Sequence, residues 1–336
     1  MKATFLEHSL RVSVVCPLCK GSLEIKRAVR HNDVIQRAIL SCVSCKTLFR
    51  IYARIPVLLE PGQRADWNHP FVEALFGYTT EPYEKLLEKY GIDRIRRRYS
   101  EVIKGEYSPP KVFFKEPVDR SLLAMGGWRI RKCSIERHLE RIKRQTEHNE
   151  ALKEMVYIVK DLSPSRILDM CSGGGFFLAH LLEKYREFRE LYSFDIDYKC
   201  AKRIEGILMY YGLLNKSLPL VTDARAMPFR QNYFDIITNN CGFGQILGYS
   251  RALRETYRAL RHSGKLVVRE IYGITRWDSS RTRKELGFSV DELVEFYKRY
   301  DIYIDKESFI AALEKIGFSI ELIKDFKESY LIVCTK

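Results

Sequence analysis

Short apolar runs alternate with helical stretches through the second half of the chain, from residue 151 to residue 336. This alternation is typical of a parallel sheet covered by helices, because parallel strands need long crossover connections. We therefore expect an α/β fold, in which the last two strands pair as an antiparallel hairpin. The expected strands are Arg166–Met170, Leu191–Asp195, Leu218–Thr222, Asp235–Asn239, Gly264–Glu270, Ser319–Lys324 and Tyr330–Thr335.

A glycine loop follows the first of these strands. Residues 169–175 read Asp-Met-Cys-Ser-Gly-Gly-Gly, and Phe176–Tyr185 has helical spacing. Glycines let the backbone turn tightly and approach a ligand, and the N-terminus of the following helix favours polar or anionic groups. Such a loop could serve a dinucleotide, but the GxGxxG spacing of that class is absent here.

The order Asp169-x-Cys171-x-Gly173-x-Gly175 resembles motif I of the class I S-adenosylmethionine (SAM) methyltransferases, with Cys171 where the family usually has glycine. Further segments resemble later motifs of that family in the expected order: Tyr192–Asp197, Val221–Phe229, Phe234–Asn240 and Leu253–Leu266. The resemblance, closest to the type 11 methyltransferases, implies a Rossmann-like seven-stranded sheet, SAM as cofactor and methyl transfer as the activity.

The same resemblance implies roles for individual residues in cofactor binding. Asp195 would accept hydrogen bonds from the ribose hydroxyls, with Asp197 as the second choice, and Asp223 would take the adenine amino group. Asn239 would lie beside the methionine part. The full set of implied cofactor residues is Asp169, Cys171, Gly173, Gly175, Asp195, Ile196, Asp223, Ala224 and Asn239.

Two CxxC pairs stand out among the nine cysteines. Cys16-Pro-Leu-Cys19 and Cys42-Val-Ser-Cys45 are separated by 22 residues, and two such turns can close a tetrahedron of thiolates around zinc. Four protein ligands leave no open coordination position, so Cys16, Cys19, Cys42 and Cys45 predict a structural zinc site, with Lys20, Lys46 and Arg50 nearby to offset its charge.

The segment around these cysteines resembles a known zinc-ribbon family. Cys16–Leu23, Leu40–Cys45 and Ile55–Leu59 are similar to the family that includes the activator subunit of tRNA and protein methyltransferases. A related zinc finger occurs in some ribosomal RNA guanine methyltransferases. Ala53-Arg54 replaces the acidic residue and glycine that usually precede the last of these segments.

The chain divides into three parts on this evidence. Residues 1–60 form the zinc ribbon, residues 61–150 a mainly helical connecting or substrate region, and residues 151–336 the methyltransferase domain. The ribbon carries strand-like runs at Leu23–Ala28, Val34–Leu40 and Leu48–Tyr52. Helices are expected at Glu84–Tyr90 and Ile135–Lys160, with a loop at residues 108–110.

The net charge of +14 is concentrated in the first part of the chain. Residues 1–150 hold 28 Lys and Arg against 18 Asp and Glu, a net charge of +10. Such asymmetry favours a polyanionic partner, and nucleic acid is the commonest one. The runs Arg94–Arg98 and Arg129–Arg144, with Trp128 beside the second, could follow a phosphate backbone and stack on a base. A solvated basic surface is the alternative.

The acceptor pocket is expected outside the carboxyl ends of the strands. We predict that Asn239, Asn240 and Tyr249 form its floor. Gln245 is a further candidate, as are Glu270 and Tyr272 after the fifth strand. The Asn-Pro-Pro-Tyr pattern that serves exocyclic base amines is absent. Cys241 could bind a soft acceptor with Cys171 or Cys200, although a small apolar filler is the commoner role. His138 or His148 could act as a base, and a solvated histidine is the alternative.

Three functional classes follow from these features. The main hypothesis is a methyltransferase acting on ribosomal or transfer RNA, for which the ribbon and the basic region supply contacts. The alternative is a methyltransferase for a small molecule, including a thiol or metalloid acceptor, or for a protein. A non-catalytic scaffold is the third class. A cytoplasmic location without membrane or disulfide-linked partners is expected, because no long apolar run or secretory signal is present and the cysteine count is odd.

Overall fold

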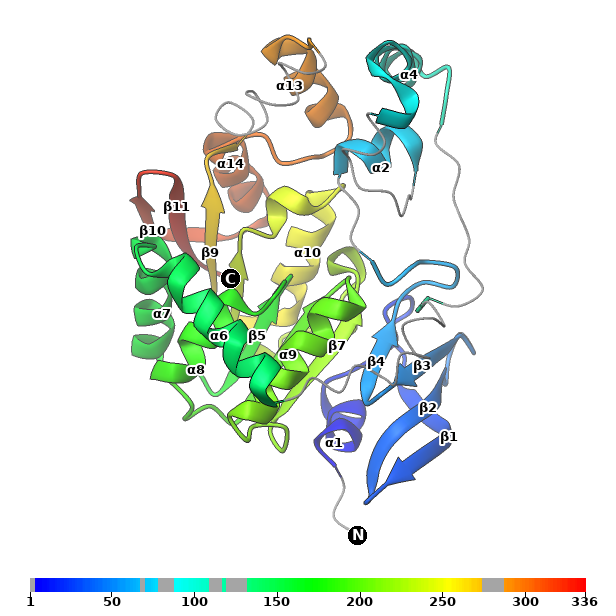
Figure 1. Cartoon of the computed structure of the whole chain (residues 1–336), viewed down its shortest axis with the longest axis vertical. Helices are drawn as coiled ribbons and strands as arrows, with labels where there is room; N and C mark the ends of the chain where they lie inside the picture. Colours follow the sequence, from blue (N-terminus) through cyan, green and yellow to red (C-terminus); the bar gives the residue numbers. More distant parts are fainter. Residues whose placement is uncertain (1–3, 67–69, 78–87, 109–116, 119–131, 274–286) are drawn as a thin grey trace.

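A single sheet of eleven strands runs through the computed structural model of the chain (Figure 1). The structure describes residues 4–66, 70–77, 88–108, 117–118, 132–273 and 287–336. The strand order is β1-β2-β3-β4-β7-β6-β5-β8-β9-β11-β10. The strands are β1 (Leu23–His31), β2 (Val34–Cys42), β3 (Leu48–Tyr52), β4 (Ile55–Leu58), β5 (Arg166–Met170), β6 (Glu190–Asp195), β7 (Ser217–Thr222), β8 (Phe234–Asn240), β9 (Leu260–Ile271), β10 (Ser319–Asp325) and β11 (Ser329–Thr335).

The last seven strands form the sheet that the methyltransferase resemblance predicted. Strands β5 to β9 are parallel neighbours, whereas β11 is antiparallel to both β9 and β10. All residues of β6 and β7 are buried, as expected for parallel strands with helices on both faces. The α/β, Rossmann-like fold class is therefore confirmed, and each predicted strand lies at the position expected for it.

Helices cover both faces of this sheet. One face is packed by α6 (Lys132–Thr146), α7 (Glu150–Leu162), α8 (Phe176–Lys184) and α9 (Tyr198–Tyr210). The other is packed by α1 (Phe5–Val12), α10 (Tyr249–Ala259) and α14 (Lys306–Ile316). The prediction of one helix over Ile135–Lys160 is wrong, because the Asn149 side chain accepts a hydrogen bond from Leu152 N at 3.0 Å and starts a new helix there.

The N-terminal ribbon continues the same sheet. Strand β4 pairs in parallel with β7 through Val57–Val221 and Leu58–Thr222, and Thr222 Oγ1 donates to Leu58 O at 3.1 Å. Helix α1, which the sequence did not reveal, buries Leu6 and Leu10 in the same hydrophobic cluster as the methyltransferase strands. The proposed boundary near residue 60 therefore separates strands that share one sheet and one core.

Three helices distant in sequence form a separate helical lobe at the top of Figure 1. They are α2 (Pro70–Phe76), α4 (Ile92–Lys104) and α13 (Val290–Arg299), and they share a hydrophobic cluster centred on Phe71, Tyr99 and Phe296. The helical character expected for residues 61–150 is present in α2, α4 and α6. Most of the expected helix Glu84–Tyr90 and most of the loop at residues 108–110 lie outside the described residues.

Candidate functional site

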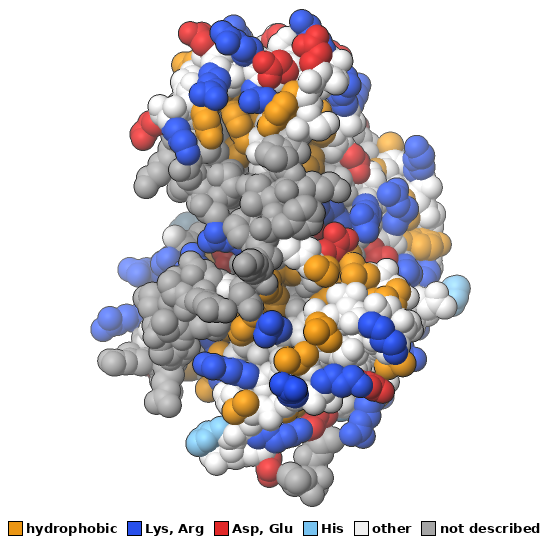
Figure 2. Space-filling view, turned by 90° about the vertical axis from the view of Figure 1, so that its right-hand side faces the viewer, with side chains coloured by type: hydrophobic (Ala, Val, Ile, Leu, Met, Phe, Trp, Pro, Cys, Tyr) orange, Lys and Arg blue, Asp and Glu red, His pale blue; other side chains and the backbone are white. Residues whose placement is uncertain are grey.

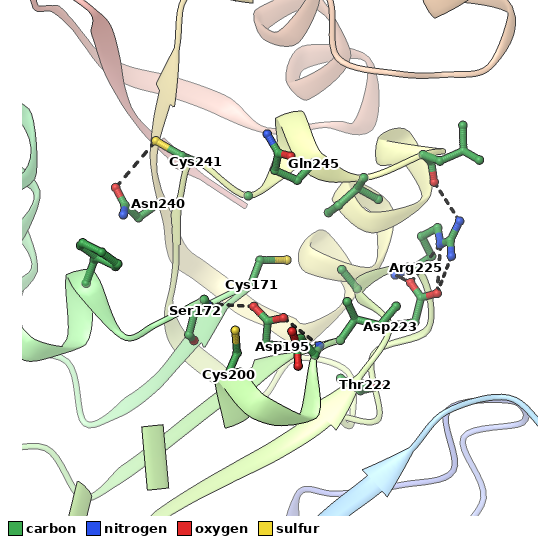
Figure 3. A pocket seen from close by; sticks show the side chains of 18 of the residues that line it. Cys171, Ser172, Asp195, Cys200, Thr222, Asp223, Arg225, Asn240, Cys241 and Gln245 are labelled. Atoms are coloured by element: carbon green, nitrogen blue, oxygen red, sulfur yellow. Dashed lines mark hydrogen bonds and ion pairs between the residues drawn. The ribbon is translucent and has the colours of Figure 1, made fainter. Parts of the chain in front are cut away.

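A cavity of about 420 Å³ opens at the carboxyl ends of β5, β6, β7 and β8 (Figure 3). This is the edge of a parallel α/β sheet where ligands bind. Its walls come from the glycine loop, the ends of β6, β7 and β8, helix α2, and the 3-10 helix at Phe243–Gln245. The lining residues are Glu73, Cys171, Ser172, Gly173, Phe176, Asp195, Ile196, Asp197, Cys200, Thr222, Asp223, Ala224, Arg225, Asn240, Cys241, Gly242, Gln245, Ile246 and Leu247.

Asp195 stands at the end of β6 with its carboxylate on the cavity wall. Its Oδ2 accepts from Gly173 N at 2.8 Å and its Oδ1 from Asp197 N at 2.9 Å. A carboxylate offers about four lone-pair sites, so both oxygens retain capacity for a diol. Burial raises the pKa of Asp195 to about 6 against the effect of these backbone donors. The alternative residue, Asp197, instead caps α9 by accepting from Lys199 N at 2.7 Å.

Asp223, directly after β7, is also on the wall but is fully engaged. Arg225 donates to it through Nη2 at 2.6 Å, through Nε at 3.0 and 3.1 Å, and through its backbone N at 2.8 Å. Gln63 Nε2 adds a further hydrogen bond to Oδ2 at 2.8 Å. Burial alone would raise the pKa of Asp223, but the Arg225 guanidinium holds it below its usual range. The sequence did not single out Arg225 or Gln63.

The glycine loop is held in a tight left-handed conformation. Cys171 has φ +53°, the region that favours glycine, which explains why glycine is usual at this position. At Gly175 a Cβ atom would come within 2.5 Å of Ile207 Cδ1. Gly175 therefore shapes the turn into α8 behind the wall. His138 of α6 steadies the loop by donating from Nε2 to Gly174 O at 2.7 Å, so His138 is not a solvated histidine, whereas His148 is exposed.

Asp169 lies behind the loop and is buried. Its Oδ1 accepts from Thr238 Oγ1 at 2.8 Å, whereas Oδ2 has no hydrogen-bond partner among the described residues. Burial raises the pKa of Asp169 to about 7. A buried oxygen without a partner is costly, but Asp169 does not line the cavity. The open acceptors of Asp195, which does line it, fit a cofactor that carries hydroxyl groups.

The three residues predicted to floor the acceptor pocket lie in different surroundings. Asn240 is on the cavity wall and accepts from Arg269 Nη1 at 3.0 Å. Asn239 is fully buried behind the wall, where its side chain donates to Met170 O and accepts from Gly242 N. Tyr249 packs at the start of α10 against the rings of Tyr303 and Phe309 and does not line the cavity. Their catalytic roles stay predictions.

The loop after β8, residues 241–245, is held in place by the side chain of Glu270. Oε1 of Glu270 accepts from Phe243 N at 2.7 Å and from Gly244 N at 3.4 Å. Burial raises the pKa of Glu270 to about 7, although it does not line the cavity. Tyr272 points elsewhere, because its hydroxyl donates to Asp325 Oδ1 at 2.7 Å. Glu270 therefore supports the loop that carries Cys241 and Gln245.

Three thiols line the cavity, as the soft-acceptor hypothesis required. They belong to Cys171, Cys200 and Cys241. In the part of the chain that the structure describes, the only cluster of three or more potential metal ligands is the one in the ribbon, so these thiols do not form a preassembled metal or metalloid site. Burial raises the pKa of all three, which keeps them protonated and weakly nucleophilic.

The four ribbon cysteines converge as the CxxC spacing predicts. The Sγ atoms of Cys16, Cys19, Cys42 and Cys45 all lie within 4.8 Å of one another, with Cys16–Cys45 at 3.7 Å and Cys19–Cys42 at 3.4 Å. A tetrahedron with a Zn–S length of about 2.3 Å separates its sulfurs by about 3.8 Å, so this donor set fits zinc. Lys20 joins the ribbon to α10 more than it offsets the charge of the cysteines, because its Nζ donates to Glu255 Oε2 at 2.8 Å.

Part of the basic run Arg94–Arg98 makes contacts within the helical lobe. Arg96 lies over the Phe288 ring and donates to Gly287 O, and Arg98 pairs with Glu101 at 3.2 Å and stacks on Tyr107. These arginines support packing between α4 and its neighbours. Trp128 and the first residues of the run 129–144 lie outside the described residues. None of the described helices is long and apolar enough to cross a membrane.

Comparison with known proteins supports the methyltransferase assignment. Residues 142–282 match the model of the ubiE/COQ5 methyltransferase family. This range includes every residue that lines the cavity except Glu73. The match confirms the prediction that the chain carries a SAM-dependent methyltransferase domain. The resemblance of the ribbon to RNA-linked zinc fingers gains no support from it.

Individual relatives cover part of the chain. The ubiquinone/menaquinone biosynthesis C-methyltransferase of Serratia proteamaculans is 30% identical over 165 residues, which are 49% of this chain and 56% of the relative. The enzyme of the same name from Edwardsiella ictaluri is 29% identical over 138 residues, or 41% of this chain and 48% of the relative. The chain thus spans about half the length of these relatives. A crystal structure of a SAM dependent methyltransferase from Aquifex aeolicus aligns with a TM-score of 0.43 and 16% identity, covering 59% of this chain and 97% of that one.

Proposed function

We propose that this chain transfers a methyl group from SAM to a small-molecule acceptor. The observation that carries the proposal is the charge of the cavity wall. Among the described residues that line the cavity, Glu73, Asp195, Asp197 and Asp223 supply carboxylates, and Arg225 is the only cation. Arg225 is itself paired with Asp223, and its Nη1 lies 3.7 Å from Glu73 Oε1. An acidic wall attracts a sulfonium and repels a phosphate backbone.

The chain's own residues would bind and align the reactants. SAM supplies a methyl group on a positively charged sulfur. Asp195 offers acceptors for the ribose, and the glycine loop lets the backbone approach the cofactor without a Cβ clash. Glu270 holds the loop that carries Cys241 and Gln245 on the opposite wall. In-line displacement depends mainly on proximity and orientation, which such rigid walls provide.

One wall of the cavity faces the helical lobe, and Glu73 in this wall lies outside the family match. Glu73 of α2 lines the cavity, and Leu247 packs against the cluster of the helical lobe. Through Glu73 and Leu247 the helical lobe reaches the cavity, so we assign the choice of acceptor to the wall that faces the lobe. The relatives are named as C-methyltransferases of ubiquinone and menaquinone biosynthesis. A hydroquinone ring carbon is therefore the first acceptor to test, in a cavity whose apolar wall includes Phe176, Ile246 and Leu247.

Calorimetry with S-adenosylhomocysteine (SAH), the demethylated cofactor, tests the cofactor half of the proposal. Asp195→Ala removes the ribose acceptor and should weaken binding by about 1.5–3 kcal/mol, or roughly ten- to a hundred-fold. Asp161→Ala, at an exposed carboxylate in α7, is the matched control. Unchanged affinity in Asp195→Ala would move the ribose contact to Asp197. Absence of SAH binding by the wild-type chain would overturn the proposal.

Methyl transfer tests the acceptor half. Radiolabelled SAM is incubated with the chain and with hydroquinones, thiols, total RNA or a protein fraction, and label is counted in each. The proposal expects label in a small solute. Label in RNA or protein alone would overturn the small-molecule assignment while leaving the cofactor assignment in place.

RNA remains the second candidate because of one feature of the ribbon. Arg27, Ile39 and Arg50 are opposite one another across β1, β2 and β3, and Arg37 lies two residues from Ile39 on the same face. These residues border a groove of about 320 Å³. Figure 2 shows Lys and Arg side chains gathered on the lower part of this side of the molecule. Single-stranded RNA bound there would lose affinity by about 0.7 log unit per log unit of salt for each phosphate contact, and Arg27→Glu with Arg37→Glu would reduce that slope.

We also propose zinc in the ribbon, held by Cys16, Cys19, Cys42 and Cys45. The convergence of the four Sγ atoms supports it. Metal analysis of the purified chain should find about one zinc per chain, and far less would contradict the assignment.

A further inference from the structure

The acceptor that the cofactor motif provides for adenine is already occupied by the chain itself. Oδ1 of Asp223 accepts from Arg225 N and Nε, and Oδ2 accepts from Arg225 Nη2 and from Gln63 Nε2. Since a carboxylate has about four lone-pair sites, these donors fill it. Asp195 on the neighbouring strand, by contrast, keeps free acceptor capacity.

Of the two residues that fill Asp223, Gln63 is the one that can leave. Arg225 is held at several points: Nη1 donates to Leu247 O at 3.0 Å and lies 3.7 Å from Glu73 Oε1, and its own backbone N donates to Asp223. Gln63 contributes one amide hydrogen bond from a half-buried side chain. Because a carboxylate only accepts, the amide must present its NH₂ group there. That group has the same donor chemistry as the amino group of adenine.

The ribbon places Gln63 at this position. Strand β4 pairs with β7 and ends five residues before Gln63, while Asp223 directly follows β7. The chain beyond Gln63 is fixed as well, since Ala65 is buried and its carbonyl accepts from Tyr198 N at 3.1 Å at the start of α9. The fold therefore brings Gln63 to Asp223, a residue of the cavity wall, although Gln63 is not itself among the lining residues.

We propose that Gln63 is a residue of the cofactor site, where its amide holds Asp223 in place of the adenine amino group and yields that position when the cofactor binds. The inference rests on the proposed function, which takes SAM as the cofactor, and on the adenine-binding role that the methyltransferase resemblance implies for Asp223. Displacing Gln63 therefore costs part of the free energy of cofactor binding. Removing the Gln63 donor therefore strengthens cofactor binding, whereas loss of an ordinary binding residue weakens it.

The test compares two ligands in two variants by calorimetry on the full chain. Gln63→Met keeps the bulk of the side chain and removes the donor. It should bind SAH about tenfold more tightly than the wild type. The gain should vanish for the SAH analogue that carries hydrogen in place of the adenine amino group, because this ligand does not compete for Asp223. Gln36→Ala is the matched control, since the amide of Gln36 contacts only Val34 O among the described residues.

The outcomes separate the two proposals. Unchanged or weaker SAH binding in Gln63→Met, with normal binding by the wild type, overturns the inference alone. An equal gain for both ligands also overturns it, because relief of crowding would then be the cause. Absence of SAH binding by the wild type overturns the proposed function and this inference with it. Thermal unfolding of each variant shows that the fold is retained.

Discussion

The zinc ribbon and the helical lobe are both additions to the seven-stranded sheet, but they are attached in different ways. The ribbon extends the sheet through β4 and β7 and shares one hydrophobic cluster with it. The lobe has a hydrophobic cluster of its own and contacts the cavity wall through Glu73, whose Oε1 lies 3.7 Å from Arg225 Nη1. A shared core unfolds as a unit, whereas a separate cluster can open locally. We therefore expect the ribbon to be part of the cofactor-binding body and the lobe to be separable from it.

Loss of the zinc ligands should have the largest effect. Zinc binding contributes about 10–16 kcal/mol in isolated zinc-finger peptides. If residues 1–60 were a separate domain, as the sequence predicts, Cys16→Ser would unfold that segment and leave cofactor binding largely intact. The shared core changes that expectation: Cys16→Ser, or a chelator, should lower the temperature of the main unfolding transition and weaken SAH binding together. Calorimetric unfolding and SAH titration measure both, and intact SAH affinity in a zinc-free chain would contradict the shared body.

A pair of phenylalanines gives the next largest effect and tests the comparison directly. Phe229 and Phe296 are both fully buried, the first in the cluster shared with the ribbon and the second in the helical lobe. Either change to alanine should cost about 3–5 kcal/mol. Phe229→Ala should lower the main transition, whereas Phe296→Ala should leave that transition and SAH affinity unchanged and increase protease cleavage within residues 70–104. Equal effects of the two variants on the main transition would show that the lobe is not separate.

The features that sequence patterns predicted correctly are those that depend on residues close together in the sequence. Period and run length located the strands, and the CxxC spacing brought four sulfurs together because each knuckle is a local turn. Signals for other features were available but unused. Asn149 followed by Glu150 is a helix start that breaks the expected long helix. Helix α1 begins with a capping box between Thr4 and Glu7.

Features of the site that depend on distant residues were not predictable in this way. The pairing of Asp223 with Gln63 spans 160 positions and exists only because β4 joins β7. The arrival of Glu73 at the cavity follows from the packing of α2, which has no periodic relation to the cofactor motifs. Asn239 and Asn240 are adjacent in sequence, yet consecutive residues of a strand face opposite ways, so Asn240 reaches the wall and Asn239 is buried.

A lysine in the ribbon should show a moderate effect. Lys20 Nζ donates to Glu255 Oε2 at 2.8 Å and to Met227 O at 3.0 Å, which joins the first CxxC turn to α10. Lys20→Met leaves these acceptors without one donor and should lower the free energy of unfolding by about 1–3 kcal/mol. Lys26→Met removes an exposed pair with Glu24 inside the ribbon and should change nothing measurable. Urea unfolding compares them, and equal midpoints would show that the ribbon is not locked to α10 by this contact.

The smallest effect concerns the link between the lobe and the cavity. Burial raises the pKa of Glu73. The charge of Arg225 lowers this pKa, and the charge of Asp223 raises it. A carboxyl whose pKa is higher in the folded than in the unfolded state stabilises the fold below its unfolded pKa, and this stability is lost as pH rises through the folded pKa. Docking of the lobe should thus weaken slightly as pH rises above about 4.5, the usual pKa of a glutamate. Glu73→Gln should remove this dependence. Protease cleavage within residues 70–104, followed across that pH range in both proteins, measures it. If cleavage of the wild type becomes slower than cleavage of the variant as pH rises, the ion pair with Arg225 outweighs the burial of Glu73. The lobe would then be bound to the cavity more firmly than its separate hydrophobic cluster implies.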